Sequence, residues 1–93
     1  MKPNNTREEI AQFLKVLGSS IRIEILLNIG KGEACVCHLE SALKKRQAYI
    51  SQHLMVLRDA GILDTRREGK YIYYRLSDSE ILSWLETTAG LLD

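Results

Sequence analysis

The sequence predicts a mainly α-helical domain that carries one β-hairpin near its C-terminal end. Between residues 6 and 60, apolar residues recur at intervals of three and four, which is the period of a helix. The period then changes to two on both sides of Glu68-Gly69, and the helical period returns after residue 77. A chain of 93 residues, 45% hydrophobic and 27% charged, is expected to form one domain with a single modest core.

The first helix is predicted over residues 6–17. Thr6 and Glu9 have the spacing of a capping box, in which each side chain bonds the backbone N–H of the other residue. We expect Gly18 to end this helix in a left-handed conformation. The apolar stripe of the helix consists of Ile10, Phe13, Leu14 and Leu17.

A second helix is expected after Ser19 or Ser20, one of which caps it. Its apolar residues surround the helix instead of lining one face, which predicts the most buried helix of the domain. Gly30 and Gly32 end it, and a short extended segment is expected near residues 33–35.

Two further helices are predicted within about residues 36–60. Apolar residues lie on one face of each, at Val36, Leu39 and Leu43 in the third helix and at Ile50, Leu54 and Leu57 in the fourth. Lys44-Lys45-Arg46 separates them without a good N-cap residue, so the fourth helix is expected to begin within one or two residues of this segment. Gly61 is expected to end the fourth helix. A short helix, a tight turn and a longer helix form a helix-turn-helix.

The alternating runs 62–67 and 70–76 predict a β-hairpin with Glu68-Gly69 as its two-residue turn. One face of the second strand is expected to pack on the core through Ile72, Tyr74 and Leu76, and the other face holds Tyr71, Tyr73 and Arg75. Ser77 and Glu80 have the spacing of a second capping box and predict a final helix over residues 78–92. A basic hairpin directly after a helix-turn-helix is typical of a winged helix.

The charge is unevenly distributed along the chain. The whole sequence has a net charge of +1, which by itself argues against binding to a nucleic acid. Residues 44–75, however, hold eight basic and three acidic residues, a net charge of +5, and the remainder carries −4. A polyanion is therefore expected to dock on the helix-turn-helix and hairpin.

Several classes of protein are excluded by the motifs. No Gly-rich phosphate loop, Gly-x-Ser-x-Gly or His-Glu-x-x-His occurs, so we do not expect an enzyme. No stretch approaches the roughly 18 apolar residues of a membrane-spanning helix, and residues 1–5 do not open a signal peptide. We therefore expect a cytoplasmic protein without a membrane partner. In a reducing compartment, Cys35 and Cys37 favour metal or redox chemistry over a structural disulfide.

Three stretches, Cys35–Leu39, Ile50–Leu63 and Arg66–Leu76, resemble the ArsR/SmtB family of winged helix-turn-helix repressors, which respond to metals and metalloids. The resemblance covers about residues 10–85. It implies a homodimer that binds a palindromic double-stranded DNA operator and is released by an effector. We expect one domain, 1–93, with its helix-turn-helix at about 36–60, its wing at about 62–76 and its dimerisation helices at about 6–17 and 78–92.

The start of the fourth helix is expected to enter the major groove, and the wing to contact the DNA backbone or minor groove. Gln47 and Gln52 could read adenine edges, and Arg46 could reach guanine or phosphate. The predicted DNA-binding residues are Lys45, Arg46, Gln47, Tyr49, Ser51, Gln52, His53, Arg66, Arg67, Lys70 and Tyr71.

Alternatives stay open for some of these residues. The Lys44-Lys45-Arg46 run can also be a solvated helix end, and His53 can be an exposed helix residue that makes no contact with DNA. At least one of Tyr73 and Tyr74 is expected to pack in the core. The whole winged helix could also serve as a protein-interaction module instead of a DNA reader.

Cys35 and Cys37 stand at the start of the third helix, where a thiolate is favoured by the helix dipole. Thiolates suit As(III), Sb(III), Cd(II), Zn(II) or Cu(I). In arsenic-sensing relatives a third cysteine follows, but this chain has Glu40 there. The pair could hold As(III) or Sb(III) with a third thiol from solution, or Zn(II) or Cd(II) with His38, Glu40 or a residue of a second subunit. The cysteines could instead be packing residues or a thiol redox sensor.

Overall fold

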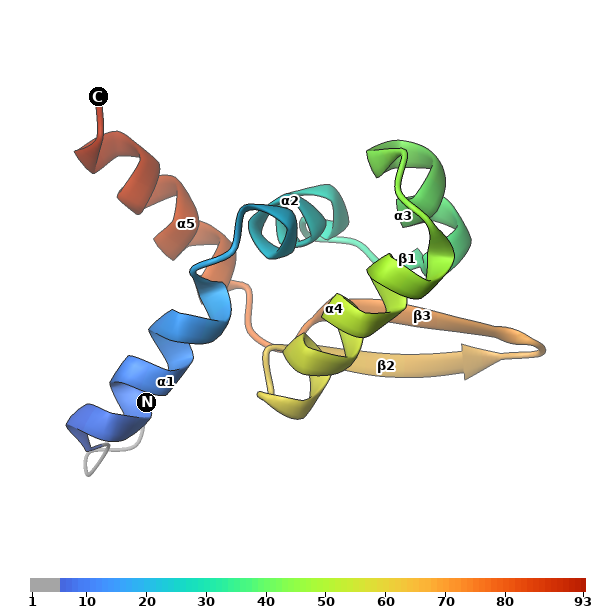
Figure 1. Ribbon diagram of the computed structural model, residues 1–93, viewed down its shortest axis with the longest axis horizontal. Coiled ribbons are helices and arrows are strands. Elements are labelled where there is room, and N and C mark those ends of the chain that lie inside the picture. Colours follow the sequence, from blue (N-terminus) through green and yellow to red (C-terminus); the bar gives the residue numbers. More distant parts are fainter. Residues whose placement is uncertain (1–5) are drawn as a thin grey trace.

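The computed structural model describes residues 6–93, so the expectation that residues 1–5 form no signal peptide lies outside the described residues. Its elements confirm the predicted order of four helices, a hairpin and a final helix (Figure 1). They are α1 (Arg7–Leu17), α2 (Ser20–Ile29), β1 (Ala34–Cys35), α3 (Val36–Leu43), α4 (Gln47–Asp59), β2 (Leu63–Glu68), β3 (Tyr71–Leu76) and α5 (Glu80–Leu91). No helix among the described residues is long and apolar enough to cross a bilayer.

The core lies where α2, α3 and α4 meet the base of the sheet. Its side chains come from positions that the helical period predicts, because residues three and four apart share one face of a helix. Those with an exposed fraction of 0% are Ile25, Leu26, Leu39, Ile50, Leu54 and Leu57. As predicted, α2 contributes much of this core, although its Leu27 remains 50% exposed.

The sheet has three antiparallel strands in the order β1-β3-β2, where the sequence predicted a wing of two strands. The extended segment before α3 lies along the outer edge of β3, with Ala34 opposite Tyr74 and Cys35 opposite Tyr73. The predicted two-stranded wing, β2 and β3, is confirmed, and so is the extended segment near residues 33–35. That this segment joins the sheet was not predicted, because a segment this short shows no alternation of its own. The segment is a strand because it pairs with β3, and since α3 begins directly after it, this pairing connects the start of α3 to the wing.

The turn of the wing lies one residue later than predicted. Glu68 still pairs with Tyr71, so Gly69 and Lys70 are the two residues of the turn. Gly69 has a φ of 62°, a left-handed conformation that a glycine adopts without the strain a Cβ would cause. The glycine is therefore the first turn residue, not the second.

The predicted helix ends are partly confirmed. Thr6 and Glu9 form both hydrogen bonds of the capping box, and Gly61 ends α4 with a φ of 78°. Gly18, however, has a φ of −79° and is not left-handed, because its N–H bonds the carbonyl of Lys15 at 3.3 Å and the chain turns directly into α2. Ser19 is the N-cap residue of α2 but forms no side-chain cap bond.

The second predicted capping box does not form. The hydroxyl of Ser77 donates to the carbonyl oxygens of Gly61 and Ile62, at 2.7 and 3.0 Å. It thereby joins the ends of α4 and β3 and is unavailable to α5. The N–H of Glu80 instead donates to Oδ1 of Asp78, at 2.9 Å.

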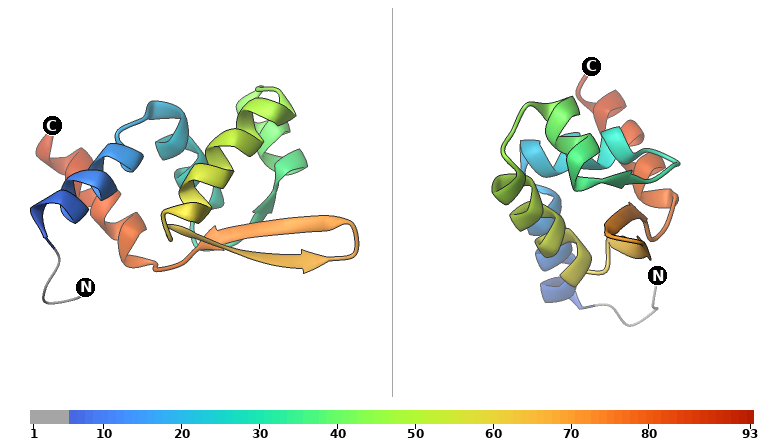
Figure 2. Two further views of the ribbon diagram at one scale, coloured as in Figure 1. Left: turned by 60° about the horizontal axis from the view of Figure 1, so that its bottom comes forward. Right: turned by 90° about the vertical axis from the view of Figure 1, so that its right-hand side faces the viewer.

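Different elements project from the two ends of the molecule (Figure 2). The wing and the start of α4 extend from one end, and α1 and α5 project from the other. Neither α1 nor α5 is among the elements in extensive contact with the rest of the chain. Leu17 and Leu85 are buried, but several large apolar side chains of these helices are exposed, at Ile10, Phe13, Leu14, Trp84 and Leu91.

Candidate nucleic-acid interface and cysteine pair

The turn that connects α3 to α4 in the helix-turn-helix contains no glycine. Lys44 ends α3 in the left-handed conformation, with a φ of 55°, and Arg46 is the extended N-cap residue of α4 without a side-chain cap bond. Lysine in this conformation lacks the usual turn signal, so the sequence located the start of α4 only approximately. The result is a three-residue turn that presents three basic side chains ahead of α4.

The predicted DNA-binding residues of this region divide by exposure. Lys45, Arg46, Gln47, Tyr49 and Gln52 are exposed, whereas Ser51 and His53 are half-buried. Ile50 and Leu54, on the opposite face of α4, are fully buried and anchor the helix to the core. The first turn and a half of α4 therefore offers basic, amide and phenolic groups to a ligand.

The wing residues fall into two groups. Arg67, Lys70 and Tyr71 are exposed near the turn, and Lys70 Nζ lies 5.4 Å from the centre of the Tyr71 ring. Within residues 6–93, Arg67 forms no ion pair. These groups are free to meet a polyanion.

Arg66 is held by the protein itself. Its guanidinium bonds both carboxylate oxygens of Glu33, bonds Glu68 at 3.1 Å, and stacks 4.8 Å from the centre of the Tyr73 ring. The hydrogen bond from Arg66 lowers the pKa of Glu33. Sequence reasoning missed Glu33, because only the pairing of β1 with β3 brings it to the wing.

His53 lies on α4, and its side chain is hydrogen-bonded to a residue of α2. Its Nδ1 accepts a hydrogen bond from Nε of Arg22, at 3.0 Å, and its ring packs edge-on against that of Tyr49. Burial, with a further effect of the Arg22 charge, lowers the pKa of His53. Sequence reasoning missed Arg22 too, although a charged residue within the most apolar helix was a signal that a partner existed.

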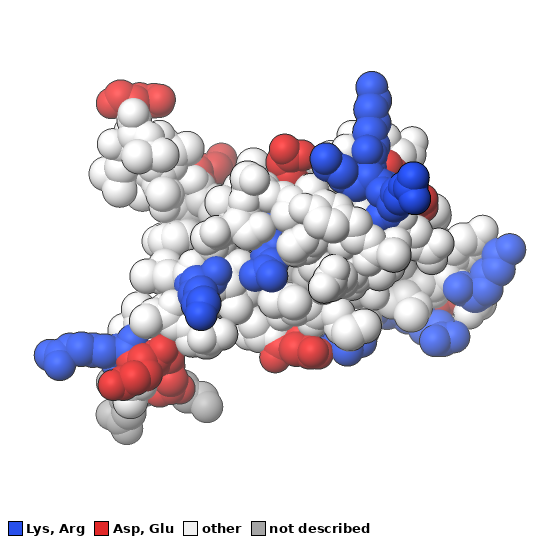
Figure 3. Space-filling model, in the orientation of Figure 1, with Lys and Arg blue, Asp and Glu red and all other residues white. Residues whose placement is uncertain are grey.

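Basic side chains mark this end of the molecule (Figure 3). Lys and Arg gather over the junction of α3 and α4 and at the tip of the wing, while Asp and Glu are prominent at the far ends of α1 and α5. On this face, basic groups are thus concentrated at the end that carries the α3–α4 junction and the wing, although one also projects at the far end of α1. A polyanion is steered to the helix-turn-helix and wing.

The two cysteines lie at the joint between the sheet and α3. Cys35 is 8% exposed, pairs with Tyr73 in the sheet, and caps α3 by accepting the N–H of His38 on its Sγ at 3.3 Å. Cys37 lies in the first turn of α3 and is exposed. Their sulfurs are joined in a disulfide, with the Cα atoms 5.4 Å apart.

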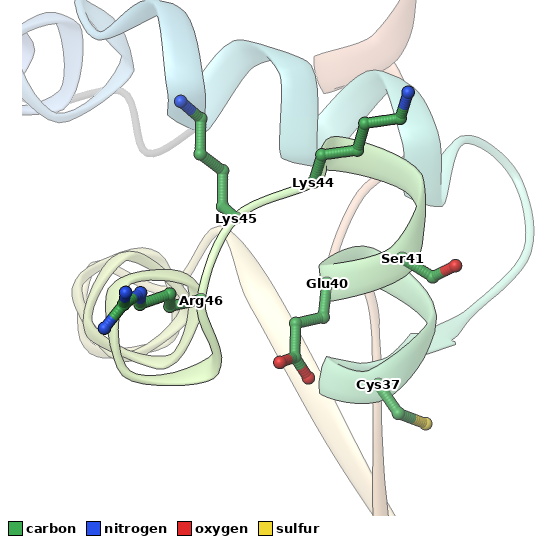
Figure 4. Close-up of a pocket in the computed structure, with 6 residues that line it drawn as sticks. All are labelled: Cys37, Glu40, Ser41, Lys44, Lys45 and Arg46. Carbon is green, nitrogen blue, oxygen red and sulfur yellow. The ribbon is translucent and has the colours of Figure 1, made fainter.

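Cys37 also lines an open pocket of about 460 Å³ at the end of the molecule that carries the basic residues (Figure 4). Glu40, Lys45 and Arg46 line the same pocket, and the Cys37 side chain points outward from α3. Among residues 6–93, no three His, Cys, Asp or Glu side chains are gathered as metal ligands. Reduction of the disulfide would therefore supply two thiolates at this joint, and neither His38 nor Glu40 completes a three-ligand site with them.

Known proteins share these features. Residues 19–65 match the model of a family described as bacterial regulatory protein, arsR family. A biofilm growth-associated repressor of Agrobacterium fabrum is 44% identical over 78 residues, which cover 84% of this chain and 67% of the relative. The arsenical resistance operon repressor of Escherichia coli K12 is 45% identical over 67 residues, 71% of this chain and 57% of the relative.

A solved structure has the same fold. HlyU from Vibrio cholerae superposes with a TM-score of 0.82 at 32% identity, over 98% of this chain and 97% of that one. The chain spans about three fifths to two thirds of the length of the two relatives above. The chain therefore belongs to the arsR family of bacterial regulatory proteins, which are transcriptional regulators and not enzymes, and it carries their DNA-binding winged helix-turn-helix.

Proposed function

We propose that this chain is a homodimeric transcriptional repressor that binds a palindromic operator and leaves it when arsenite, or another thiophilic metal or metalloid, binds Cys35 and Cys37. The observation that carries the proposal is the position of Cys35. This residue is at once a strand residue paired with the wing and the N-cap of α3. Any ligand on its sulfur acts on both parts that contact DNA.

DNA recognition is assigned to the exposed start of α4 and to the wing. Gln47 and Gln52 have the amide groups that bind adenine edges, and Arg46 can bind guanine or phosphate. Lys45, Arg67 and Lys70 supply phosphate contacts, which position the protein and make its affinity depend on salt. These side chains are exposed, which is what contact with DNA requires.

Dimerisation is assigned to α1 and α5. Phe13 on α1 and Trp84 on α5 are 38% and 42% exposed, although a small monomer gains stability by burying such side chains. A two-fold dimer also matches a palindromic operator, whose half-sites lie about one helical turn apart. Trp84→Ser is expected to shift the protein toward monomer in sedimentation velocity while its helical circular dichroism is retained. A variant that stays dimeric at micromolar concentration would contradict this interface.

Effector binding is assigned to the reduced cysteine pair. Because Cys35 Sγ accepts the His38 N–H, a metalloid that draws this sulfur toward Cys37 and a third ligand would shift the cap of α3. The displaced helix contacts α4 through Leu39, which is fully buried. A coupling of about 1–3 kcal/mol would lower operator affinity roughly 5- to 150-fold.

The test is an operator titration of the reduced protein with arsenite, antimonite, Cd(II) and Zn(II). Arsenite is expected to release wild type but not the Cys35→Ser/Cys37→Ser variant. Serine is itself a good N-cap residue, so this variant should retain α3 and bind the operator with unchanged affinity. Release by arsenite that survives the double substitution would refute the assignment. Failure of wild type to prefer the promoter fragment of its own gene over random DNA would refute the repressor function.

A second candidate function is a thiol redox sensor, and the disulfide between Cys35 and Cys37 favours it. The exposed Cys37 thiolate would attack a hydroperoxide, forming a sulfenic acid and releasing an alcohol or water. The buried Cys35 thiol would then form the S–S bond, and the sulfenic oxygen would leave as water. Peroxide-dependent change in operator affinity, reversed by dithiothreitol and absent in Cys37→Ser, supports this candidate; a response retained in Cys37→Ser rejects it.

A further inference from the structure

One arginine connects the end of α1 to the middle of α4. Nη1 of Arg22 donates to the carbonyl oxygen of Val16 at 3.1 Å, and Nε of the same guanidinium donates to Nδ1 of His53 at 3.0 Å. Both Arg22 and His53 are half-buried. The planar guanidinium holds its N–H groups in a fixed relation, so two bonds from one group fix α4 relative to the end of α1.

The bond to His53 requires the neutral ring. A nitrogen accepts a hydrogen bond only without a proton, so the proton of the neutral ring is on Nε2. Burial and the charge of Arg22 lower the pKa of His53, which keeps the ring neutral at physiological pH. Protonation would remove the acceptor and place a second positive charge beside Arg22.

Within residues 6–93, no carboxylate contributes to the pKa shift of His53. Arg22 of α2 is the charged group that shifts its pKa, and Tyr49 of α4 itself packs against the ring, with the ring centres 4.7 Å apart. α3 and β2 also pack against α4, and their carboxylates, Glu40, Asp64 and Glu68, are not among the groups that shift the pKa of His53. Loss of the bond on protonation is therefore uncompensated.

We propose that Arg22 and His53 are positioning residues that set the recognition helix α4 against α1, and with it the spacing of the two recognition helices in a dimer. The inference rests on the proposed binding of an operator by a dimer formed through α1. In such a dimer the link joins the apolar interface helix to the helix that enters the major groove. His53 then acts through Arg22 and not by touching a base.

The direction of the pH effect separates this role from direct contact. A positioning His53 loses its bond on protonation, so operator affinity falls as the pH decreases. A His53 that touched a DNA phosphate would gain charge on protonation, and affinity would rise. The two roles thus predict changes of opposite sign.

The experiment measures operator affinity by fluorescence anisotropy at pH 7.5 and pH 5.5 at constant ionic strength. His53→Asn keeps an acceptor oxygen near the position of Nδ1 and does not titrate, whereas His53→Leu removes the acceptor. His38→Asn is the matched control, because His38 is the other histidine of the chain and its side chain is exposed. The ring pKa values are measured by NMR on the free protein, in wild type and in Arg22→Met.

Wild type and His38→Asn are expected to lose affinity at pH 5.5, by up to about fivefold, which is the equivalent of one hydrogen bond. His53→Asn should bind like wild type at pH 7.5 and change less with pH, and His53→Leu should bind more weakly at both. In the free protein, the pKa of His53 should lie below the ordinary histidine value of about 6.5 and rise in Arg22→Met.

Two results would overturn the proposal: an affinity that rises at pH 5.5, or a His53→Asn variant that loses as much as wild type. If no variant binds the operator at any pH, the proposed function itself fails. The NMR arm remains decisive in that case, since a His53 pKa that is not lowered, or does not respond to Arg22→Met, removes the link.

Discussion

Arg67→Gln is expected to reduce the salt dependence of operator binding more than Arg66→Gln, although each variant removes one positive charge from the same strand. Arg67 is exposed and, within residues 6–93, forms no ion pair. Arg66 bonds Glu33 and Glu68 and stacks on Tyr73. A guanidinium that already has two carboxylate partners must give them up before it can neutralise a phosphate.

The magnitude follows from counterion release. Each phosphate contact contributes about −0.9 to the slope of log affinity against log salt concentration. One contact by Arg67 in each subunit of a dimer therefore contributes about −1.8. Between 50 and 200 mM salt, wild type should lose about 12-fold more affinity than Arg67→Gln.

The assay is a fluorescence anisotropy titration of labelled operator at four salt concentrations, with wild type and the two matched variants. Arg66→Gln should retain a slope close to that of wild type. Equal reductions of the slope in both variants would refute the reasoning, because Arg66 would then contact phosphate as freely as Arg67. Unchanged thermal unfolding of both variants serves as the control for folding.

Three further predictions concern stability. Leu54→Ala should lower the free energy of unfolding by about 2–5 kcal/mol, since this α4 side chain is fully buried in the core. Urea denaturation at fixed protomer concentration measures the change, and a loss below about 1 kcal/mol would contradict the prediction. Thr6→Ala should cost about 0.5–2 kcal/mol by removing the cap of α1, with faster amide exchange confined to that helix. Because folding lowers the pKa of His53, its stabilisation should be present above about pH 6.5 and be lost as the pH falls through the folded value. Urea midpoints at pH 7.5 and 5.5 should therefore differ more for wild type than for His53→Asn, and equal differences would contradict the sign.

Local signals predicted most of the secondary structure. The sequence predicted the capping box at Thr6, the buried stripe of α4 and the alternation of β3, because each depends on residues close in sequence. The predictions failed where a distant partner competed. Ser77 had the spacing of a cap but bonds the carbonyl of Gly61, 16 positions away, at the end of α4. The hairpin turn differs from the prediction for a local reason, since Glu68 pairs with Tyr71 and leaves Gly69 and Lys70 as the turn.

The candidate site shows the same division. The basic segment and the exposed start of α4 could be predicted, since charge and helical period place them on a surface. The ion pair between Arg66 and Glu33 could not be predicted, because these residues are 33 positions apart and meet only through the pairing of β1 with β3. Likewise, Arg22 and His53 are 31 positions apart and meet through the packing of α2 on α4.

The sequence by itself determined the order of the elements, the core faces of the helices and the basic segment at residues 44–75. These properties follow from periodicity, local capping and composition, which act over a few residues. Only the tertiary structure decided which basic side chains remain free and which are held by carboxylates. It also decided that Cys35 belongs to both the wing sheet and α3, because hydrogen bonds between distant strands depend on how the chain folds back on itself.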